Sequence, residues 1–450
     1  MLRPAHVIQA CAAALLALGV VMVHSAGASV HGADAAAADA GPIAAATGVL
    51  NPRTLVYAGL ALGVMVVASR INVREMFSIR PIHLGPDATL SDRLAHLLRG
   101  RGWFNPLWVI VLLSLALTAL TLVPGMGKNV NGASRWLYIG GPSMGISFQP
   151  SELVKWVMVL AVAWWCARRR FVMHKFVHGL LPPILLMILA CGMIVIEDLG
   201  TAALIGLVGV CMLIAGGARW WQLGLFAVAG LGGLIALIIN TPYRLQRLTT
   251  FLDPWADPAG AGYHPIQSML AFAQGGLQGS GLGQSIQKYY IPEDTTDFIF
   301  PILAEELGLP GAAIVVLLIL AILWVGLGIV KDCKDTFGRL VGLGVLLTFG
   351  IQAAVNLAVV TVVVPTKGIA LPLVSNGGTG WILCGFSLGL VAALDNANYY
   401  QVAPAGDELV EAELDEEPTR PDDGATDDET PEDDAPENDT PPGIVDLSLA

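Results

Sequence analysis

The sequence predicts an all-α integral membrane protein of about ten transmembrane helices, with a large extracytoplasmic loop between the seventh and eighth helices. Two observations support this fold class. The 450 residues are 55% hydrophobic and 13% charged, with a mean hydropathy of +0.66, which leaves too few polar side chains to cover a soluble globule of that size. The apolar residues also form uninterrupted runs of roughly 17 to 25, the length of a helix that crosses a bilayer.

Ten apolar runs follow one another along the chain. They cover residues of about 5–24, 54–70, 105–124, 151–167, 178–196, 199–217, 222–240, 299–329, 338–362 and 379–397. The eighth run is too long for one span and contains Pro301 and Pro310, so we expect its outer third to be a separate or kinked piece. The first run also resembles a signal peptide, because Arg3 precedes it and small residues follow it. Cleavage there would leave nine helices in the same orientation.

Basic residues predict the orientation of the helices, because Lys and Arg are enriched in cytoplasmic loops. The basic clusters at 70–101, 168–175 and 331–339 fall on one side of the membrane if all ten runs span it. Both termini are then cytoplasmic, and the segments at about 125–150, 241–298 and 363–378 face outward. Residues 27–50, rich in Ala and Gly, are expected to form an outer linker.

The C-terminal segment differs in composition from the rest of the chain. From Asp407 onward it holds 18 of the 36 carboxylates against one basic residue, Arg420. Such a segment has too little apolar surface to repay its ordering entropy. We therefore expect a disordered acidic cytoplasmic tail over 405–450 after a membrane domain over 1–404, and no binding of nucleic acid. The six cysteines include no C-x-x-C pair, so we predict no disulfide and no metal-thiolate site.

The outward loop at 241–298 does not have the composition of a simple connector. It combines Asp-Pro turns, glycines, two arginines and carboxylates with apolar, helix-like pieces. Long loops of this kind are often functional, although a passive exterior cap is the alternative. Three other segments stand out: NGASRWLYIGGPSMGISFQPSELVK at 131–155, DLGTA at 198–202 and PTKGIALPLVSNGG at 365–378.

The long loop and these three segments, taken in their order along the chain, resemble the SEDS family of membrane proteins, which includes FtsW, RodA and SpoVE. The long loop reads FLDPWADPAGAGYHPIQS and ends in PEDTTDFIFPILAEELG, close to the family pattern. The forms PTKG and GQSIQK are closer to the division branch, FtsW, than to the elongation branch. The resemblance implies a peptidoglycan glycosyltransferase that polymerises lipid II into β-1,4 glycan strands at the outer face of the cytoplasmic membrane during cell division. It also implies a class B penicillin-binding protein and other division proteins as partners, and no organic cofactor.

Asp297 is the residue that the resemblance assigns as the catalytic carboxylate. The implied reaction inverts the anomeric carbon of an α-linked donor, so one general base must take the proton of the acceptor hydroxyl. Asp297 lies at the outer start of the eighth apolar run, at the depth where a lipid-linked sugar would be presented. Without the resemblance, a helix cap would be the better interpretation of this aspartate.

Other charged residues near the outer helix ends are candidate substrate-binding groups. Glu152 and Lys155 are spaced i, i+3 and are predicted to pair, either structurally or beside the substrate. Glu305 and Glu306 follow Asp297 by about two turns, and we expect one to face a cavity and the other to be satisfied by packing. Outward-facing cations would hold the pyrophosphate of the donor. The candidates are Arg244 and Arg247 first, then Arg135, with Lys288 and Lys367.

Several questions stay open at the level of sequence. A divalent cation shared between pyrophosphate and carboxylates would suit Mg²⁺ or Mn²⁺, but no residue spacing establishes such a site. The chain departs from the family pattern at Thr295, Asn376 and Glu197, where His, Tyr and Pro are usual. The missing histidine removes a potential proton partner near Asp297. Two other functions remain as alternatives: transport of lipid II across the membrane, and a noncatalytic scaffold for a penicillin-binding protein.

Overall fold

The computed structural model describes residues 3–27, 52–71, 106–130, 133–139, 146–291 and 296–402. The predicted linker, the acidic tail and Thr295 lie outside these residues. The α-helices are α1 (Pro4–Gly27), α3 (Pro52–Ala68), α6 (Pro106–Thr121), α7 (Pro150–Arg168), α8 (Leu181–Val195), α9 (Leu199–Ala215), α10 (Trp220–Ile239), α11 (Pro242–Leu252), α12 (Tyr263–Gly275), α13 (Ile299–Asp332), α14 (Thr336–Val360) and α15 (Thr379–Val402). A π-helical turn, η3 (Phe176–Leu180), leads into α8, and the short 3₁₀ turns η4 (Pro254–Ala256) and η5 (Gln287–Tyr289) lie in the long loop.

All ten predicted apolar runs are helices in the structure, which confirms the polytopic fold class. Within the described residues, seven helices are long and apolar enough to cross a membrane: α1, α7, α8 together with η3, α10, α13, α14 and α15. The other three, α3, α6 and α9, are equally apolar but have only 16 or 17 residues. At 1.5 Å per residue these are about 25 Å long, slightly less than the hydrocarbon core of a typical bilayer.

Helix α13 is kinked near its N-terminal end, as the sequence predicts. Gly308 interrupts the helix with φ 66° and ψ −164°, and Pro310 follows it inside the helix. Proline removes a helical N–H and clashes with the preceding turn, while glycine tolerates the positive φ. The carbonyls of Glu305 and Glu306 accept hydrogen bonds from the backbone N–H groups of residues 280–281, both at 2.9 Å. The kink therefore binds the long loop directly to the N-terminal piece of α13.

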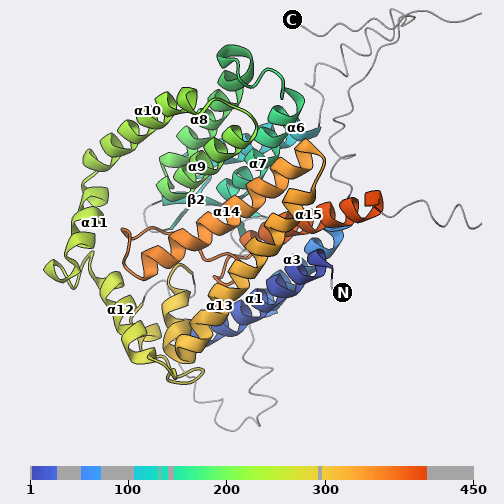
Figure 1. Cartoon of the computed structure of the whole chain (residues 1–450). Helices are drawn as coiled ribbons and strands as arrows, with labels where there is room; N and C mark the ends of the chain where they lie inside the picture. The colour runs from blue at the N-terminus through green and yellow to red at the C-terminus, as the bar shows by residue number, and fades with distance from the viewer. Residues whose placement is uncertain are drawn as a thin grey trace, which may run out of the picture. The chain divides into compact units, whose positions relative to one another are not determined.

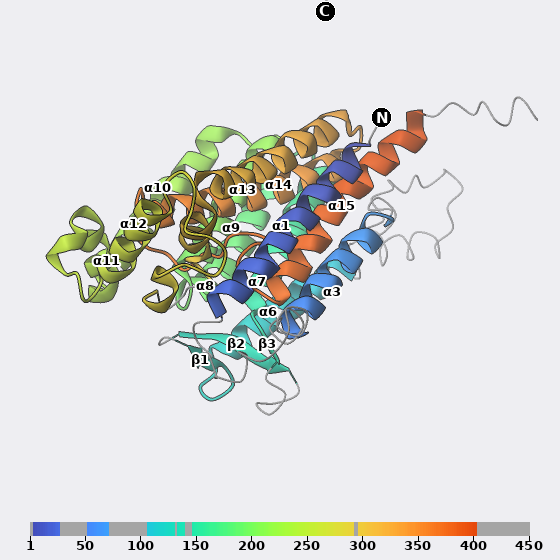
Figure 2. The ribbon, with the colours of Figure 1, turned by 90° about the horizontal axis from the view of Figure 1, so that it is seen from below.

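Helices that are early in the sequence pack against helices that are late in the sequence. Helix α1 runs beside α13 (Figure 1), and Figure 2 shows it between α13 and α15, with α3 against α15. At one end of this group the N–H of Ala5 donates to Asp395 Oδ2 at 3.1 Å. At the other end the Ser25 hydroxyl donates to Glu306 at 2.6 Å. The helix ends thus alternate between two faces, as expected for a chain that crosses a membrane repeatedly.

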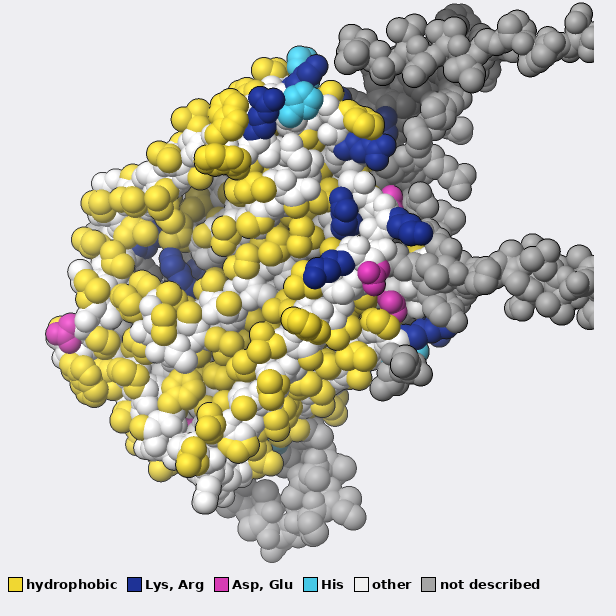
Figure 3. Space-filling model, in the orientation of Figure 1, with side chains coloured by type: hydrophobic (Ala, Val, Ile, Leu, Met, Phe, Trp, Pro, Cys, Tyr) yellow, Lys and Arg dark blue, Asp and Glu magenta, His cyan; other side chains and the backbone are white. Residues whose placement is uncertain are grey.

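Helix α10 stands apart from the other helices. Figure 1 shows it in an arc with α11, and only 11% of its apolar window is buried. Its first half contacts η3, because Phe226 stacks on Phe176 with ring centroids 5.9 Å apart. Hydrophobic side chains cover most of the face in Figure 3, and Lys and Arg side chains gather at its upper and right edges. This surface suits a hydrocarbon environment with charged ends.

A small antiparallel sheet joins α6 to α7, and the sequence analysis did not predict it. Its strands are β1 (Lys128–Val130), β2 (Ala133–Ile139) and β3 (Ile146–Phe148), in the order β1-β2-β3. Leu137 pairs with Phe148 in the register between β2 and β3. The strands lie beside the end of α6 and the start of α7 (Figure 2). The sheet matters because β2 carries Arg135.

Candidate functional site

Asp297 lies at the end of the bundle where α13 begins and is half-buried. The N-cap residue of α13 is Phe298, and that residue makes no side-chain cap hydrogen bond. Asp297 directly precedes this N-cap residue. Its backbone carbonyl accepts a hydrogen bond from the Asn356 side chain on α14 at 2.9 Å.

Asp297 and Arg135 approach the same point of the loop between α14 and α15. A Cβ placed on Gly368 would lie 3.0 Å from Asp297 Oδ2 and 3.9 Å from Arg135 Nη1. These two atoms are therefore no more than about 7 Å apart. The Nε of Arg135 is buried and has no hydrogen-bond partner in the structure. A guanidinium with an unused buried donor is suited to an anionic ligand.

Three further predicted cations lie together around the same loop. Arg244 and Arg247, both on α11, each donate a hydrogen bond to a backbone carbonyl at 3.3 Å. Burial lowers the pKa of Lys367, and the nearby charges of Arg247 and Arg244 lower it further, while Asp198 opposes the shift. Mutual repulsion of this kind is relieved by a bound anion. Figure 3 shows Lys or Arg side chains inside a hollow framed by α10, α11, α12 and α14.

A second polar pocket adjoins the site at the ends of α6 to α9. Its lining includes Arg135, Ser151, Glu197 and Asp198. Asp198 caps α9 by accepting from the N–H of Thr201 at 3.0 Å. The departure from the family pattern at Glu197 thus adds a carboxylate to the lining of the pocket that also includes Arg135.

Glu152 and Lys155 form the predicted ion pair, with Lys155 Nζ 2.8 Å from Glu152 Oε2. Lys155 is 3% exposed and also donates to Gln352 Oε1 at 2.7 Å. The amide of Gln352 in turn donates to the Ala370 carbonyl at 2.9 Å. This chain of contacts connects α7 to α14 and to the loop at 361–378. The pair therefore holds the walls of the site together.

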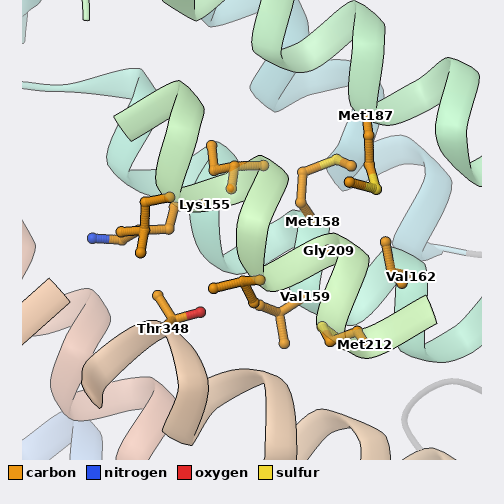
Figure 4. A pocket seen from close by; sticks show the side chains of 11 residues that line it. Lys155, Met158, Val159, Val162, Met187, Gly209, Met212 and Thr348 are labelled. Atoms are coloured by element: carbon orange, nitrogen blue, oxygen red, sulfur yellow. The ribbon is translucent and has the colours of Figure 1, made fainter. Parts of the chain in front are cut away.

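The interior of the bundle next to Lys155 is apolar. Figure 4 shows a pocket between helices that is lined by Lys155, Thr348 and the methionines Met158, Met187 and Met212. The Lys155 nitrogen lies at one end and points away from the methionine side chains (Figure 4). Such a lining offers few groups that could bind a sugar or a pyrophosphate.

Lys288, Glu305 and Glu306 lie in a separate, buried network, which corrects the expectation that one of the two glutamates faces a cavity. Both glutamates are 1% exposed. Glu305 accepts from the Ser285 hydroxyl at 2.5 Å, and Glu306 accepts from the Ser25 hydroxyl and lies 3.9 Å from Lys288 Nζ. These partners are all protein groups, so the network holds the long loop, α1 and α13 together.

Asn356 and Gln352 were missed by the sequence analysis. Both lie on α14 within a predicted span, and both side chains are buried. Two amides spaced i, i+4 in an apolar segment are a detectable signal, because polar groups at membrane depth are costly unless they have partners. No cluster of three or more His, Cys, Asp or Glu side chains that could hold a metal ion occurs within the described parts of the chain.

The fold and the site together define a polytopic membrane protein that presents a carboxylate and a group of cations at one end of its helices. This is the arrangement expected for chemistry on an anionic, membrane-anchored substrate.

Comparison with known proteins agrees with this class. The model of the cell cycle protein family FTSW_RODA_SPOVE matches residues 96–400. The probable peptidoglycan glycosyltransferase FtsW of Idiomarina loihiensis is 36% identical over 369 residues, which cover 78% of this chain and 89% of that protein. Stage V sporulation protein E of Bacillus subtilis is 37% identical over 304 residues, 67% of this chain and 81% of that protein. The chain belongs to the FtsW/RodA/SpoVE family.

Solved structures show the same fold. A chain from a study of how a peptidoglycan synthase complex coordinates polymerization and crosslinking aligns with a TM-score of 0.62 and 26% identity, over 87% of this chain and 97% of that chain. The rod shape determining protein RodA of Thermus thermophilus aligns with a TM-score of 0.55 and 23% identity, over 87% of this chain and 96% of that chain.

Proposed function

We propose that this protein is a peptidoglycan glycosyltransferase that polymerises lipid II into β-1,4 glycan strands, with Asp297 as the general base. One observation carries the proposal: the Asp297 carboxylate approaches Gly368 together with Arg135, and Gly368 directly follows Lys367, whose charge interacts with those of Arg247 and Arg244. A base for the acceptor hydroxyl and cations for a pyrophosphate leaving group thus meet at one place. The relatives named as peptidoglycan glycosyltransferases support the same activity.

The proposed reaction is a single inverting displacement. Asp297 takes the proton of the 4-hydroxyl of the incoming lipid II, and that oxygen attacks the anomeric carbon of the growing chain. The bond from this carbon to the pyrophosphate oxygen breaks, and undecaprenyl pyrophosphate leaves with the electron pair. The cations stabilise the negative charge that develops on the leaving group. Any divalent cation at the site would take most of its ligands from the pyrophosphate and water, and Mg²⁺ or Mn²⁺ would suit these oxygen donors.

The setting of the reaction is also a proposal. With both termini in the cytoplasm, the end of the bundle that carries Asp297 faces outward, where lipid-linked sugars are polymerised. The exposed arginines at 168–170 then lie at the cytoplasmic surface, in agreement with the excess of basic residues expected there. We propose a class B penicillin-binding protein as the partner, because the solved neighbour comes from a complex that combines polymerization and crosslinking. The relatives named FtsW support a role in cell division.

Transport of lipid II is less well supported by the arrangement of charges. A carrier would need polar groups along a path through the bundle. The cations near Asp297 gather at one end instead, and the interior pocket beyond Lys155 is lined mainly by apolar side chains. A scaffold without activity would not need Asp297 and the cations to converge.

The proposal is tested by gel-resolved polymerisation of labelled lipid II with the purified protein and its penicillin-binding partner. Asp297→Asn should reduce the rate by about 100- to 10,000-fold, the usual effect of losing a general base. Asp332→Asn, which removes an exposed carboxylate at the other end of α13, is the matched control and should polymerise normally. Equal activity of wild type and Asp297→Asn would exclude the general base. No product from wild type with its partner would exclude the activity itself.

A further inference from the structure

Asn356 is a buried amide that joins the two segments carrying the proposed base and the proposed phosphate-binding lysine. Its side chain is 1% exposed, on α14. Its Nδ2 donates to the carbonyl of Asp297 at 2.9 Å and to the carbonyl of Ile369 at 2.7 Å. The amide must be oriented this way, since its oxygen would repel both carbonyls. One side chain thus fixes the backbone of two segments that are more than 70 residues apart.

Gln352 adds to this connection from one turn earlier on α14. Its Nε2 donates to the carbonyl of Ala370, directly after Ile369. Residues spaced i, i+4 share a helix face, so Gln352 and Asn356 hold consecutive carbonyls of the loop at 361–378. The Gln352 oxygen is occupied by Lys155. Gln352 therefore fixes the loop to the bundle, whereas Asn356 is the amide that also reaches the segment of the base.

The hydrogen bond from Asn356 to the Ile369 carbonyl fixes the loop residues that the Asp297 carboxylate approaches. Gly368 and Lys367 directly precede Ile369, and the carboxylate approaches Gly368. Movement of either carbonyl relative to the other would change the distance from the carboxylate to Lys367 and Arg135. Inverting transfer requires the base and the leaving-group cations to act on the same sugar pair, so this distance matters for the reaction rate.

The asparagine at this position also carries a cost in stability. Its Oδ1 is buried without a hydrogen-bond partner, and an unpaired buried amide oxygen lowers stability. An apolar residue of similar shape would avoid this cost within a membrane helix. The two hydrogen bonds donated by Nδ2 are what such a residue could not provide.

We propose that Asn356 is a positioning residue for glycosyl transfer, which acts through Asp297 and the Lys367 loop and does not touch the substrate. This inference rests on the proposed function. It predicts that the amide is needed for the chemical step and contributes little to the binding of lipid II.

The test compares Asn356→Leu with Thr348→Val in complexes of the full chain with its partner. Thr348 is a matched control, because it is also 1% exposed on α14 and donates a hydrogen bond to the Gly344 carbonyl at 2.7 Å, away from Asp297. Folded protein is quantified by thermal unfolding, and kcat and KM for lipid II are measured per folded molecule. Asn356→Leu should lower kcat about 100-fold, the effect of a displacement near 1 Å, with KM within about threefold of wild type. Thr348→Val should keep both values.

A second variant covers the case in which Asn356→Leu does not fold. Asn356→Ser keeps one donor and a smaller side chain, and it should fold while recovering only part of kcat. Wild-type kcat per folded molecule in either Asn356 variant would overturn the positioning role, as would a loss of activity explained entirely by loss of folded protein. If wild type makes no glycan, the proposed function fails and this inference fails with it. If wild type is active and the Asn356 variants are equally active, only this inference fails.

Discussion

Replacement of Lys288 by methionine should destabilise the protein by removing a cation from a closed network. The Lys288 ammonium donates to the carbonyl of Gly283 at 2.8 Å and to that of Ser25 at 3.3 Å, and it lies 3.9 Å from Glu306 Oε1. The side chains of Lys288 and Glu306 are 4% and 0% exposed. Both charges are therefore shielded from solvent in the folded protein.

The magnitude follows from the charge that is left behind. In Lys288→Met, Glu306 keeps its bonds to the Ser25 hydroxyl and the Ser285 N–H but loses its buried cation. Breaking a buried ion pair from one side typically costs about 3–5 kcal/mol. We expect a loss of this size in the free energy of unfolding, measured by denaturant titration of the purified protein in detergent. The double variant Lys288→Met/Glu306→Gln removes both charges and should recover more than half of the loss.

The control and the refuting result are equally specific. Lys331→Met removes an exposed cation at the far end of α13, and it should change the free energy of unfolding by no more than about 0.5 kcal/mol. If Lys288 instead held the pyrophosphate of the substrate, Lys288→Met would keep its stability and raise KM for lipid II. That combination would refute the structural assignment.

Two further predictions concern the loop that faces Asp297. Gly368→Ala should leave stability unchanged but lower kcat for polymerisation about tenfold, because its Cβ would lie only 3.0 Å from Asp297 Oδ2. Gly192→Ala is the control and should have no effect, because no atom lies within 4 Å of its Cβ. Unchanged kcat in Gly368→Ala would contradict the described geometry. Because the pKa of Lys367 is lowered, KM for lipid II should rise as the pH increases through that pKa, below the pH at which an ordinary lysine loses its proton. Lys367→Arg should remove this rise, since arginine stays charged, and an identical pH profile would exclude Lys367 from binding the pyrophosphate.

The helices were predictable because the signal for them is local. Each apolar run is recognised from the hydropathy of its own residues. A break in the eighth run was expected from the prolines that surround Gly308. The sheet that carries Arg135 was not predicted, since strands of three to seven residues within a loop give little periodic signal. The bounds of the spans could thus be derived from composition, but the connection between α6 and α7 could not.

The site was predictable only in part, because its contacts join residues that are distant in sequence. Family resemblance identified Asp297 and the cations that the structure brings near it. The pairing of Lys288 with Glu306, and the bond from Ser25, depend on α1 lying against α13, which hydropathy does not reveal. For the same reason both glutamates appeared to be candidates for substrate binding. The two amides of α14 were detectable as polar residues in an apolar run, but the partners of Asn356 are backbone carbonyls, which the sequence does not reveal.

The packing of α1 has a consequence for how the protein is made. Among the described helices, α1 is synthesised before the others, whereas two of its principal neighbours, α13 and α15, are synthesised after all but α14. The hydroxyl of Ser25 bonds to a carboxylate 281 residues later, so at 5–20 residues per second it waits roughly 15 to 55 s for its partner. Gly19 packs against the backbone of Leu373 in the folded protein, and this contact too is missing until residue 373 has been made. Lipid or the insertion machinery must therefore surround α1 until α13 and α15 have been made, and the bundle closes around a helix synthesised long before its partners.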